Sequence, residues 1–195
     1  MNCSKDYELS RSVFIADSVF TDLPAYSEWG YNTFGAYFDR QVFISNGAEV
    51  PAKVISTDTS VTFMLKGQKG LNYDSYYDGY GYSYGSGEAM SLSFILPLTP
   101  PDTLTDLVQW NNTVVDLTTP GCRIFLTEDT LKTEVQVLSG SLQFKRAQVL
   151  SVDDRLVEVI LSGRFSLQMM LRDEPYSLTE GRFDVGVGDG SFYRL

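Results

Sequence analysis

Period-2 alternation of apolar and polar residues from Val157 to Leu171 is the feature that most constrains the fold of this chain. The odd positions are apolar apart from one glycine, while the even positions include Glu158, Arg164 and Gln168. Because strand side chains point alternately to two faces, this pattern predicts an antiparallel strand with one face on a core. Such a strand would span about 50 Å, which is unusually long, so we expect a bend or bulge at Ser162-Gly163.

The same alternation predicts three more strands in the C-terminal half. The residues expected to face inward are Leu131, Val135 and Val137 in the first strand, Leu142 and Phe144 at the start of the second, and Phe183, Val185 and Val187 in the third. In the second strand the alternation slips by one position at Lys145-Arg146 before it resumes at Ala147. A slip of this kind predicts a β-bulge.

The N-terminal half is also typical of strands, separated by turn residues. The runs are Thr33–Phe38, Gln41–Ile44, Ala52–Ser56, Val61–Leu65 and Ala89–Leu96. One helix is expected at Asp102–Trp110, with Asp102 as its cap and Leu104, Leu107 and Val108 on one face. We therefore predict an all-β antiparallel sandwich or barrel-like fold, a lipocalin-like barrel included, with at most one short helix. Residues 1–10 are expected to form a tether and residues 11–195 a single domain.

Charge and composition exclude several classes of function. The net charge is −10 and no run of Lys or Arg occurs, so a nucleic-acid partner is not expected. The chain contains no histidine, which excludes Ser-His-Asp and Cys-His catalysis and the common zinc and iron sites that need an imidazole. We expect no cofactor and no metal, and the remaining enzymatic alternative is chemistry by a pair of carboxylates.

The segment Tyr73–Tyr84 holds six tyrosines, mixed with glycine, serine and aspartate. Because it lies between two expected strands, we predict a long loop or hairpin tip at about 72–87. Tyrosine offers a rigid amphipathic face at low entropic cost, and antibody paratopes use this same mixture of residues. One hypothesis is a binding surface for a glycan or a protein, contacted by Tyr76, Tyr77, Tyr80, Tyr82 and Tyr84. The alternative is a solvated loop of low complexity.

Weaker candidates are spread along the chain. For a glycoside hydrolase, Asp153-Asp154 and Asp173-Glu174 are acidic pairs, but both fall in expected turns where acids are normally solvated. For calcium, Asp74, Asp78-Gly79 and Gly188-Asp189-Gly190 lack EF-hand spacing. Gly81–Gly85 matches GxSxG without the histidine or the helix that this motif requires, so we interpret it as a chance match. Cys3 and Cys122 match no metal-ligand spacing, and a disulfide between them remains an alternative.

Two stretches resemble a known family. Asn32-Thr33-Phe34-Gly35 up to Asp39, followed by Val42-Phe43-Ile44, is similar to the opening strand pair of small Bacteroidetes lipoproteins of unknown function. Ser162–Ser166 and Leu178–Val185, which ends in Glu-Gly-Arg-Phe-Asp-Val, resemble the closing pair of that family. Arg40 and Ala36 depart from its usual glycine and cysteine, and the tyrosine-rich segment is atypical.

The resemblance implies an extracytoplasmic all-β domain in the periplasm or at the outer membrane, with a cytoplasmic location as the alternative. It also implies that Cys3 is a lipid-bearing residue, which would be the only link to a membrane. Because Met1-Asn2 is no lipobox, the signal would have to lie upstream. The function predicted from all of this is a non-catalytic binding or structural module of the cell envelope.

Overall fold

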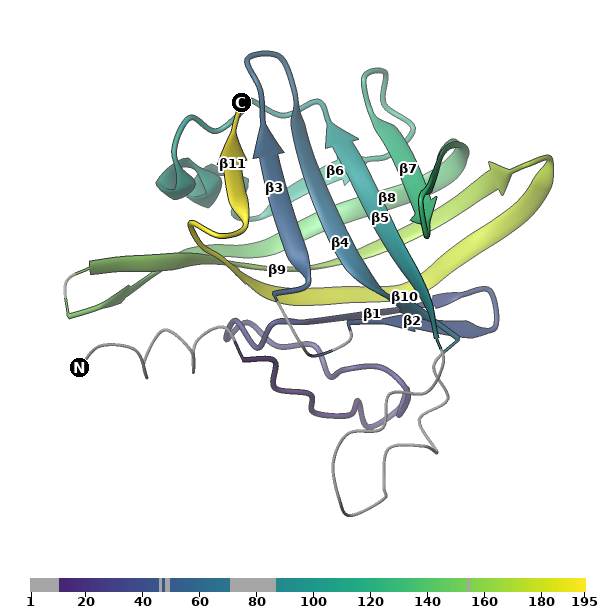
Figure 1. Cartoon of the computed structure of the whole chain (residues 1–195), viewed down its shortest axis with the longest axis horizontal. Coiled ribbons are helices and arrows are strands. Elements are labelled where there is room, and N and C mark those ends of the chain that lie inside the picture. The colour runs from purple at the N-terminus through teal and green to yellow at the C-terminus, as the bar shows by residue number, and fades with distance from the viewer. Residues whose placement is uncertain (1–10, 46, 48–49, 71–86, 154) are drawn as a thin grey trace.

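The computed structural model describes residues 11–45, 47, 50–70, 87–153 and 155–195, and these form an all-β fold with one short helix (Figure 1). The strands are β1 (Thr33–Phe38), β2 (Gln41–Ile44), β3 (Ala52–Ser56), β4 (Val61–Lys69), β5 (Glu88–Leu96), β6 (Thr113–Asp116), β7 (Arg123–Glu128), β8 (Leu131–Val152), β9 (Arg155–Leu171), β10 (Glu174–Val187) and β11 (Phe192–Arg194). All of them belong to one sheet, which confirms the predicted fold class.

The sheet closes on itself into a barrel-like ring. Strand β4 pairs with β5 along one edge, and along the other edge it pairs first with β3 and then with β2. The antiparallel pairings continue from β5 through β7, β8, β9 and β10 to β1, and β1 pairs with β2. Figure 1 shows β3, β4 and β5 crossing the long strands β8 and β9. The stretches that resemble the lipoprotein family lie in β1 and β2 and in β9 and β10, and the pairing of β1 with β10 makes them neighbours in the ring.

Aromatic side chains fill the inside of this ring. The Phe63 ring centroid lies 5.3 Å from that of Phe144 and 5.1 Å from that of Phe183, and all three side chains are buried. Trp110 packs on Phe144 with a centroid distance of 4.8 Å. The inward residues predicted for β9 and β10, including Phe165 and Val185, are part of the same core. The interior is therefore a packed core, as in small barrels whose side chains meet at the centre.

The long strands differ from the prediction in three ways. Strand β8 is one continuous strand where two were expected. Leu131, expected to face inward, is 56% exposed because it lies at the β7–β8 turn. The bulge predicted at Ser162-Gly163 lies on the partner strand instead, at Lys145, where the slip in alternation had also predicted one. Gly163 itself stays in register, and a Cβ there would collide with the carbonyl oxygen of Gln143.

The helix is a 3-10 helix, η2, from Leu104 to Trp110. Its N-cap is Thr103 and not the predicted Asp102, and Asp106 accepts the backbone N–H of Thr103 at 2.8 Å. Leu104, Leu107 and Trp110 are buried against the core, whereas Val108, expected on that face, is 40% exposed. A three-residue repeat explains this, since 104, 107 and 110 then share one side.

Residues 11–32, here called the strap, cover the outer face of the ring beneath β1 and β10 (Figure 1, dark purple). From Gly181 to Val187 the odd positions of β10 point into the core, so the even positions Arg182 and Asp184 point outward under the strap. Arg182 is 2% exposed, binds Asp17 of the strap at 2.7 Å and lies over the Phe20 ring. The strap therefore turns an outer face of the sheet into a second buried layer.

Candidate functional site

The five tyrosines predicted to form a binding surface lie outside the described residues, but the structure describes both ends of their segment. Strand β4 ends at Lys69, and β5 begins at Glu88, its partner in the strand register. The Lys69 ammonium binds Glu88 at 3.2 Å and Glu128 at 2.8 Å. Although burial opposes the charge, these two carboxylates raise the pKa of Lys69. The segment thus leaves and rejoins the sheet at a fixed, charged pair of residues.

An open groove of 690 Å³ lies beside this pair of residues. It forms where the β1–β2 turn, the end of β4 and the start of β10 meet. Its lining consists of two aromatic rings together with polar and charged groups, namely Phe38, Asp39, Arg40, Gln41, Lys69, Tyr176 and Ser177. The rings of Phe38 and Tyr176 are 5.2 Å apart and tilted by 40°, and Phe38 is held beneath the Lys69 ammonium at 5.3 Å.

Hydrogen bonds fix the shape of the groove. Asp39 occupies the turn with φ +52, and its Oδ1 accepts the backbone N–H of Ser177 at 2.8 Å and the Ser177 hydroxyl at 3.0 Å. The Tyr176 hydroxyl donates to Glu174 at 3.0 Å, and this bond raises the pKa of Tyr176. The β1–β2 turn is therefore attached to β10, and the aromatic pair has little freedom to move apart.

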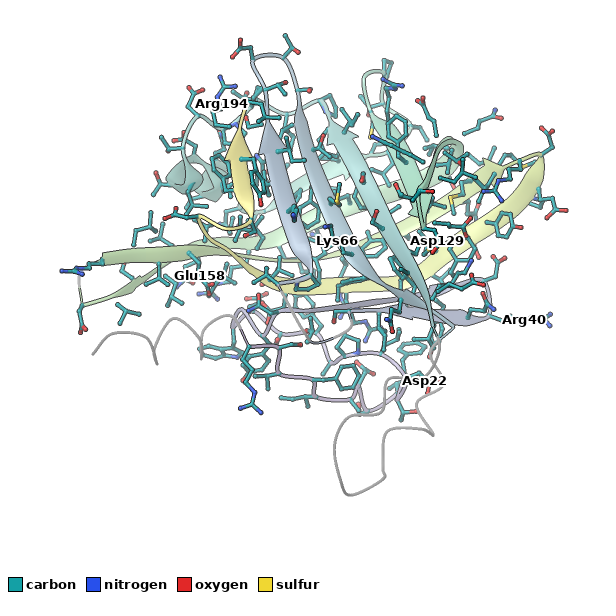
Figure 2. The ribbon with its side chains drawn as sticks, viewed as in Figure 1. Asp22, Arg40, Lys66, Asp129, Glu158 and Arg194 are labelled. Atoms are coloured by element: carbon teal, nitrogen blue, oxygen red, sulfur yellow. The ribbon has the colours of Figure 1, made fainter. Side chains whose placement is uncertain are left out.

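Arg40 and Gln41 are exposed residues at the rim of the groove. Figure 2 shows Arg40 at the outer end of the β1–β2 hairpin, pointing away from the sheet. Among the residues that the structure describes, no ion pair is formed by Arg40. Its guanidinium is thus a donor available to a ligand, next to an aromatic surface.

A second polar cluster, which the sequence did not predict, lies under the strap. Asp184 is 2% exposed and accepts five hydrogen bonds. Three donors are the backbone N–H groups of Trp29, Gly30 and Tyr31, at 3.1, 2.8 and 3.2 Å, and two are the hydroxyls of Ser27 and Ser162. This carboxyl group holds the strap on β10, which is a structural role.

Glu158 lies in the same buried layer, on the outer face of β9. Its residue is 6% exposed, and burial followed by the nearby charge of Asp184 raises the pKa of Glu158 to about 7. The alternation in the sequence placed Glu158 on the polar face and so toward solvent. Glu158 does lie on the outer face of β9, as predicted, but the strap covers that face. No local pattern in the sequence indicates that the strap lies there.

The other candidates from the sequence do not come together. Asp153 lies in the β8–β9 turn and Asp173 in the β9–β10 turn, at opposite ends of β9, which at strand rise is about 50 Å long. Asp189 lies in the turn before β11, and Asp74, Asp78 and Asp154 fall outside the described residues. Within the described part of the chain, no group of three or more acidic or cysteine residues is placed to hold a metal ion.

Of the two cysteines, the structure describes Cys122. Cys122 has a free, partly buried thiol, and burial followed by the charge of Asp116 raises its pKa, so its reactivity toward oxidants is low. Cys3 lies outside the described residues.

Comparisons with known proteins give no relative for this chain: no family model matches it, and neither the curated proteins nor the solved structures include a significant match. In the part of the chain that the structure describes, none of the helical residues form a segment with the length and apolarity needed to cross a membrane.

Proposed function

We propose that this chain is a non-catalytic binding module whose ligand, a neutral glycan, lies in the groove between the β1–β2 turn and β10. The observation that carries this proposal is the fixed aromatic pair of Phe38 and Tyr176 on a groove lined by donors and acceptors. The groove also adjoins Lys69 and Glu88, the two ends of the tyrosine-rich segment predicted to bind a ligand.

The chemistry of the groove suits a sugar. The C–H face of a pyranose ring packs on an aromatic ring, as Tyr176 would offer, while Arg40 and Gln41 donate to hydroxyl groups and Asp39 accepts from them. Both signs of charge line the groove, and the chain as a whole carries −10. A neutral ligand is therefore favoured over a polyanion, which the net charge would repel.

Two alternatives receive less support from the geometry. A protein ligand would need a larger surface than this groove, since specific protein interfaces bury about 800 Å² per partner. A glycan-active enzyme would need two carboxyl groups across a cleft. Glu158 and Asp184 do lie in one cluster, but they lie under the strap and do not line the groove, and Asp184 is occupied by five donors.

The cellular setting is part of the same proposal. The resemblance of the β1–β2 and β9–β10 pairs to Bacteroidetes lipoproteins supports an extracytoplasmic module of the cell envelope, anchored by a lipid on Cys3. Residues 3–11 could extend over about 30 Å at most, so an anchored domain would stay close to the membrane surface. A glycan of the envelope or the medium would then be within reach.

Binding of neutral oligosaccharides to the wild type and to Tyr176→Ala tests the proposal. A glycan array identifies the ligand and calorimetry measures its affinity. We expect Tyr176→Ala to lose about tenfold or more in affinity, because a ring-stacking contact worth about 1.4 kcal/mol is removed. The matched control is Tyr193→Ala, an exposed tyrosine on β11 that does not line the groove. Failure of every neutral glycan to bind, or equal affinities of wild type and Tyr176→Ala, would overturn the proposal.

A further inference from the structure

The carboxyl group of Glu158 occupies a space formed by two glycines on different elements. A Cβ at Gly186 of β10 would overlap Oε2 of Glu158, and a Cβ at Gly30 of the strap would lie 3.3 Å from Oε1. The acid thus lies between β10 and the strap with 6% of the residue exposed, and Figure 2 shows it below β9, on the side of the strap. Gly30 has φ +75, a conformation that glycine adopts without strain, so the strap can pass this close to the carboxyl.

No hydrogen bond from the described residues reaches the carboxyl oxygens of Glu158. The neighbouring backbone N–H groups donate to other acceptors. The N–H of Gly186 donates to Asn32 at 2.9 Å, and the N–H of Gly30 donates to Asp184 at 2.8 Å. A buried carboxylate without donors is costly, whereas the protonated acid is tolerated. This agrees with a pKa of about 7 for Glu158, raised first by burial and then by Asp184.

The charged groups on the surrounding elements leave Glu158 without a cation. On the same outer face, β8 carries Lys145 and Arg146, β9 carries Arg155 and Arg164, β10 carries Arg182 and Asp184, and the strap carries Tyr26, Glu28 and Tyr31. The Lys145 ammonium lies over the Tyr26 ring at 5.5 Å. Arg146 binds Glu28, Arg164 lies over the Tyr26 ring, and Arg182 binds Asp17. Asp184 is the charge that acts on Glu158, and its sign disfavours ionisation.

We propose that closure of the strap over β10 is coupled to protonation of Glu158, so that the strap is a pH-sensitive cover of this face. With the strap closed, the acid is enclosed and neutral. With the strap open, the acid is hydrated and ionises as an ordinary glutamate. Alkaline pH therefore favours the open strap and acidic pH the closed one. Opening would expose Arg182, Asp184 and the face of β10, without any change in the packed core of the ring.

The linkage has a defined size and sign. The pKa of Glu158 is about 7 when the strap is closed, against the ordinary value of 4.5 when it is open. The closed strap is thus most stable at pH values below 4.5, the pKa of Glu158 in the open state. Its stability falls as the pH rises toward about 7, the pKa in the closed state, and stays constant at higher pH. Between pH 6 and pH 8 the population of the open strap should rise about tenfold.

Hydrogen exchange of the full-length protein tests this coupling. The readout is the three amides that donate to Asp184, those of Trp29, Gly30 and Tyr31. After correction for the intrinsic pH dependence of exchange, their protection should fall about tenfold from pH 6 to pH 8. In Glu158→Gln the protection should be the same at both pH values. Amides of β5 should show no pH effect in either protein, because β5 lies in the core of the sheet.

A control variant and a second measurement accompany the exchange experiment. Glu134→Gln removes an exposed acid on β8 and should behave as the wild type. Should Glu158→Gln fail to fold, an NMR titration of the Glu158 side-chain carboxyl carbon in the wild type provides a second measurement. Wild-type protection that does not change with pH, a pH dependence that persists in Glu158→Gln, or a midpoint near 4.5 would each overturn the proposal.

Discussion

Asp184→Asn tests whether one carboxyl group holds the strap on the sheet. Oδ1 accepts from Gly30 and the Ser162 hydroxyl, while Oδ2 accepts from Trp29, Tyr31 and the Ser27 hydroxyl. An amide nitrogen can replace only one of these oxygens, and the lower cost comes from replacing Oδ1. The Ser162 hydroxyl can then rotate and accept, whereas the buried N–H of Gly30 loses its acceptor.

The expected loss follows from these contacts. A buried donor left without an acceptor costs about 1–3 kcal/mol, and the remaining bonds weaken because the acceptor is no longer a carboxylate. We therefore expect Asp184→Asn to lower the free energy of unfolding by about 2–4 kcal/mol.

Urea unfolding followed by tryptophan fluorescence measures this loss, and the protein offers two distinct reporters. Trp29 of the strap is 74% exposed, whereas Trp110 is 2% exposed in the core. The matched control is Asp39→Asn, which removes an acid that also accepts a backbone N–H but lies exposed at a turn, and it should cost less than about 1 kcal/mol. If Asp184→Asn costs no more than Asp39→Asn, the role assigned to Asp184 is wrong.

Two further predictions concern the close contact of β8 with β9 and the chain terminus. Gly163→Ala should lower the free energy of unfolding by about 1–3 kcal/mol, because the new Cβ collides with Gln143 and the strands must separate. The control is Gly190→Ala, whose Cβ would meet nothing within 4 Å. Equal thermal midpoints of the two variants would contradict the reasoning. In the native host, wild-type protein should fractionate with membranes and Cys3→Ala should not, so unchanged fractionation would exclude the lipid anchor.

The strands were predictable because their signal is local. Alternation over β9 identifies Phe165 and Leu167 as core residues, and a slip in alternation identifies the bulge at Lys145. The short strands β6 and β7 were missed, since four to six residues give too little alternation to stand out. The sequence predicted a sandwich or a barrel but did not decide between them, because no local pattern specifies that β1 pairs with β10.

The polar layer under the strap shows where prediction from alternation fails. Arg182 and Asp184 occupy the polar positions of an alternating strand, which ordinarily means solvent. They are buried because an irregular segment, distant in sequence, covers both of them. Its backbone N–H groups donate to Asp184, and its Asp17 accepts from Arg182. The predicted runs Thr33–Phe38 and Gln41–Ile44 leave only a two-residue turn between them. The groove beside that turn needs β4 and β10 as well, and only the closed ring brings these three segments together.

The pairing of β1 with β10 has a consequence for the order of folding. Thr33 and Asp184 are partners although about 150 residues separate them along the chain. During synthesis the strap and β1 emerge early, yet the surface that receives both of them is made last. Until β10 arrives, the edge of β1 stays unpaired and the Phe20 ring lacks the Arg182 side chain that lies over it, a state prone to association with other chains. Export before folding, or a chaperone that shields this early segment, would suit a protein with this connectivity.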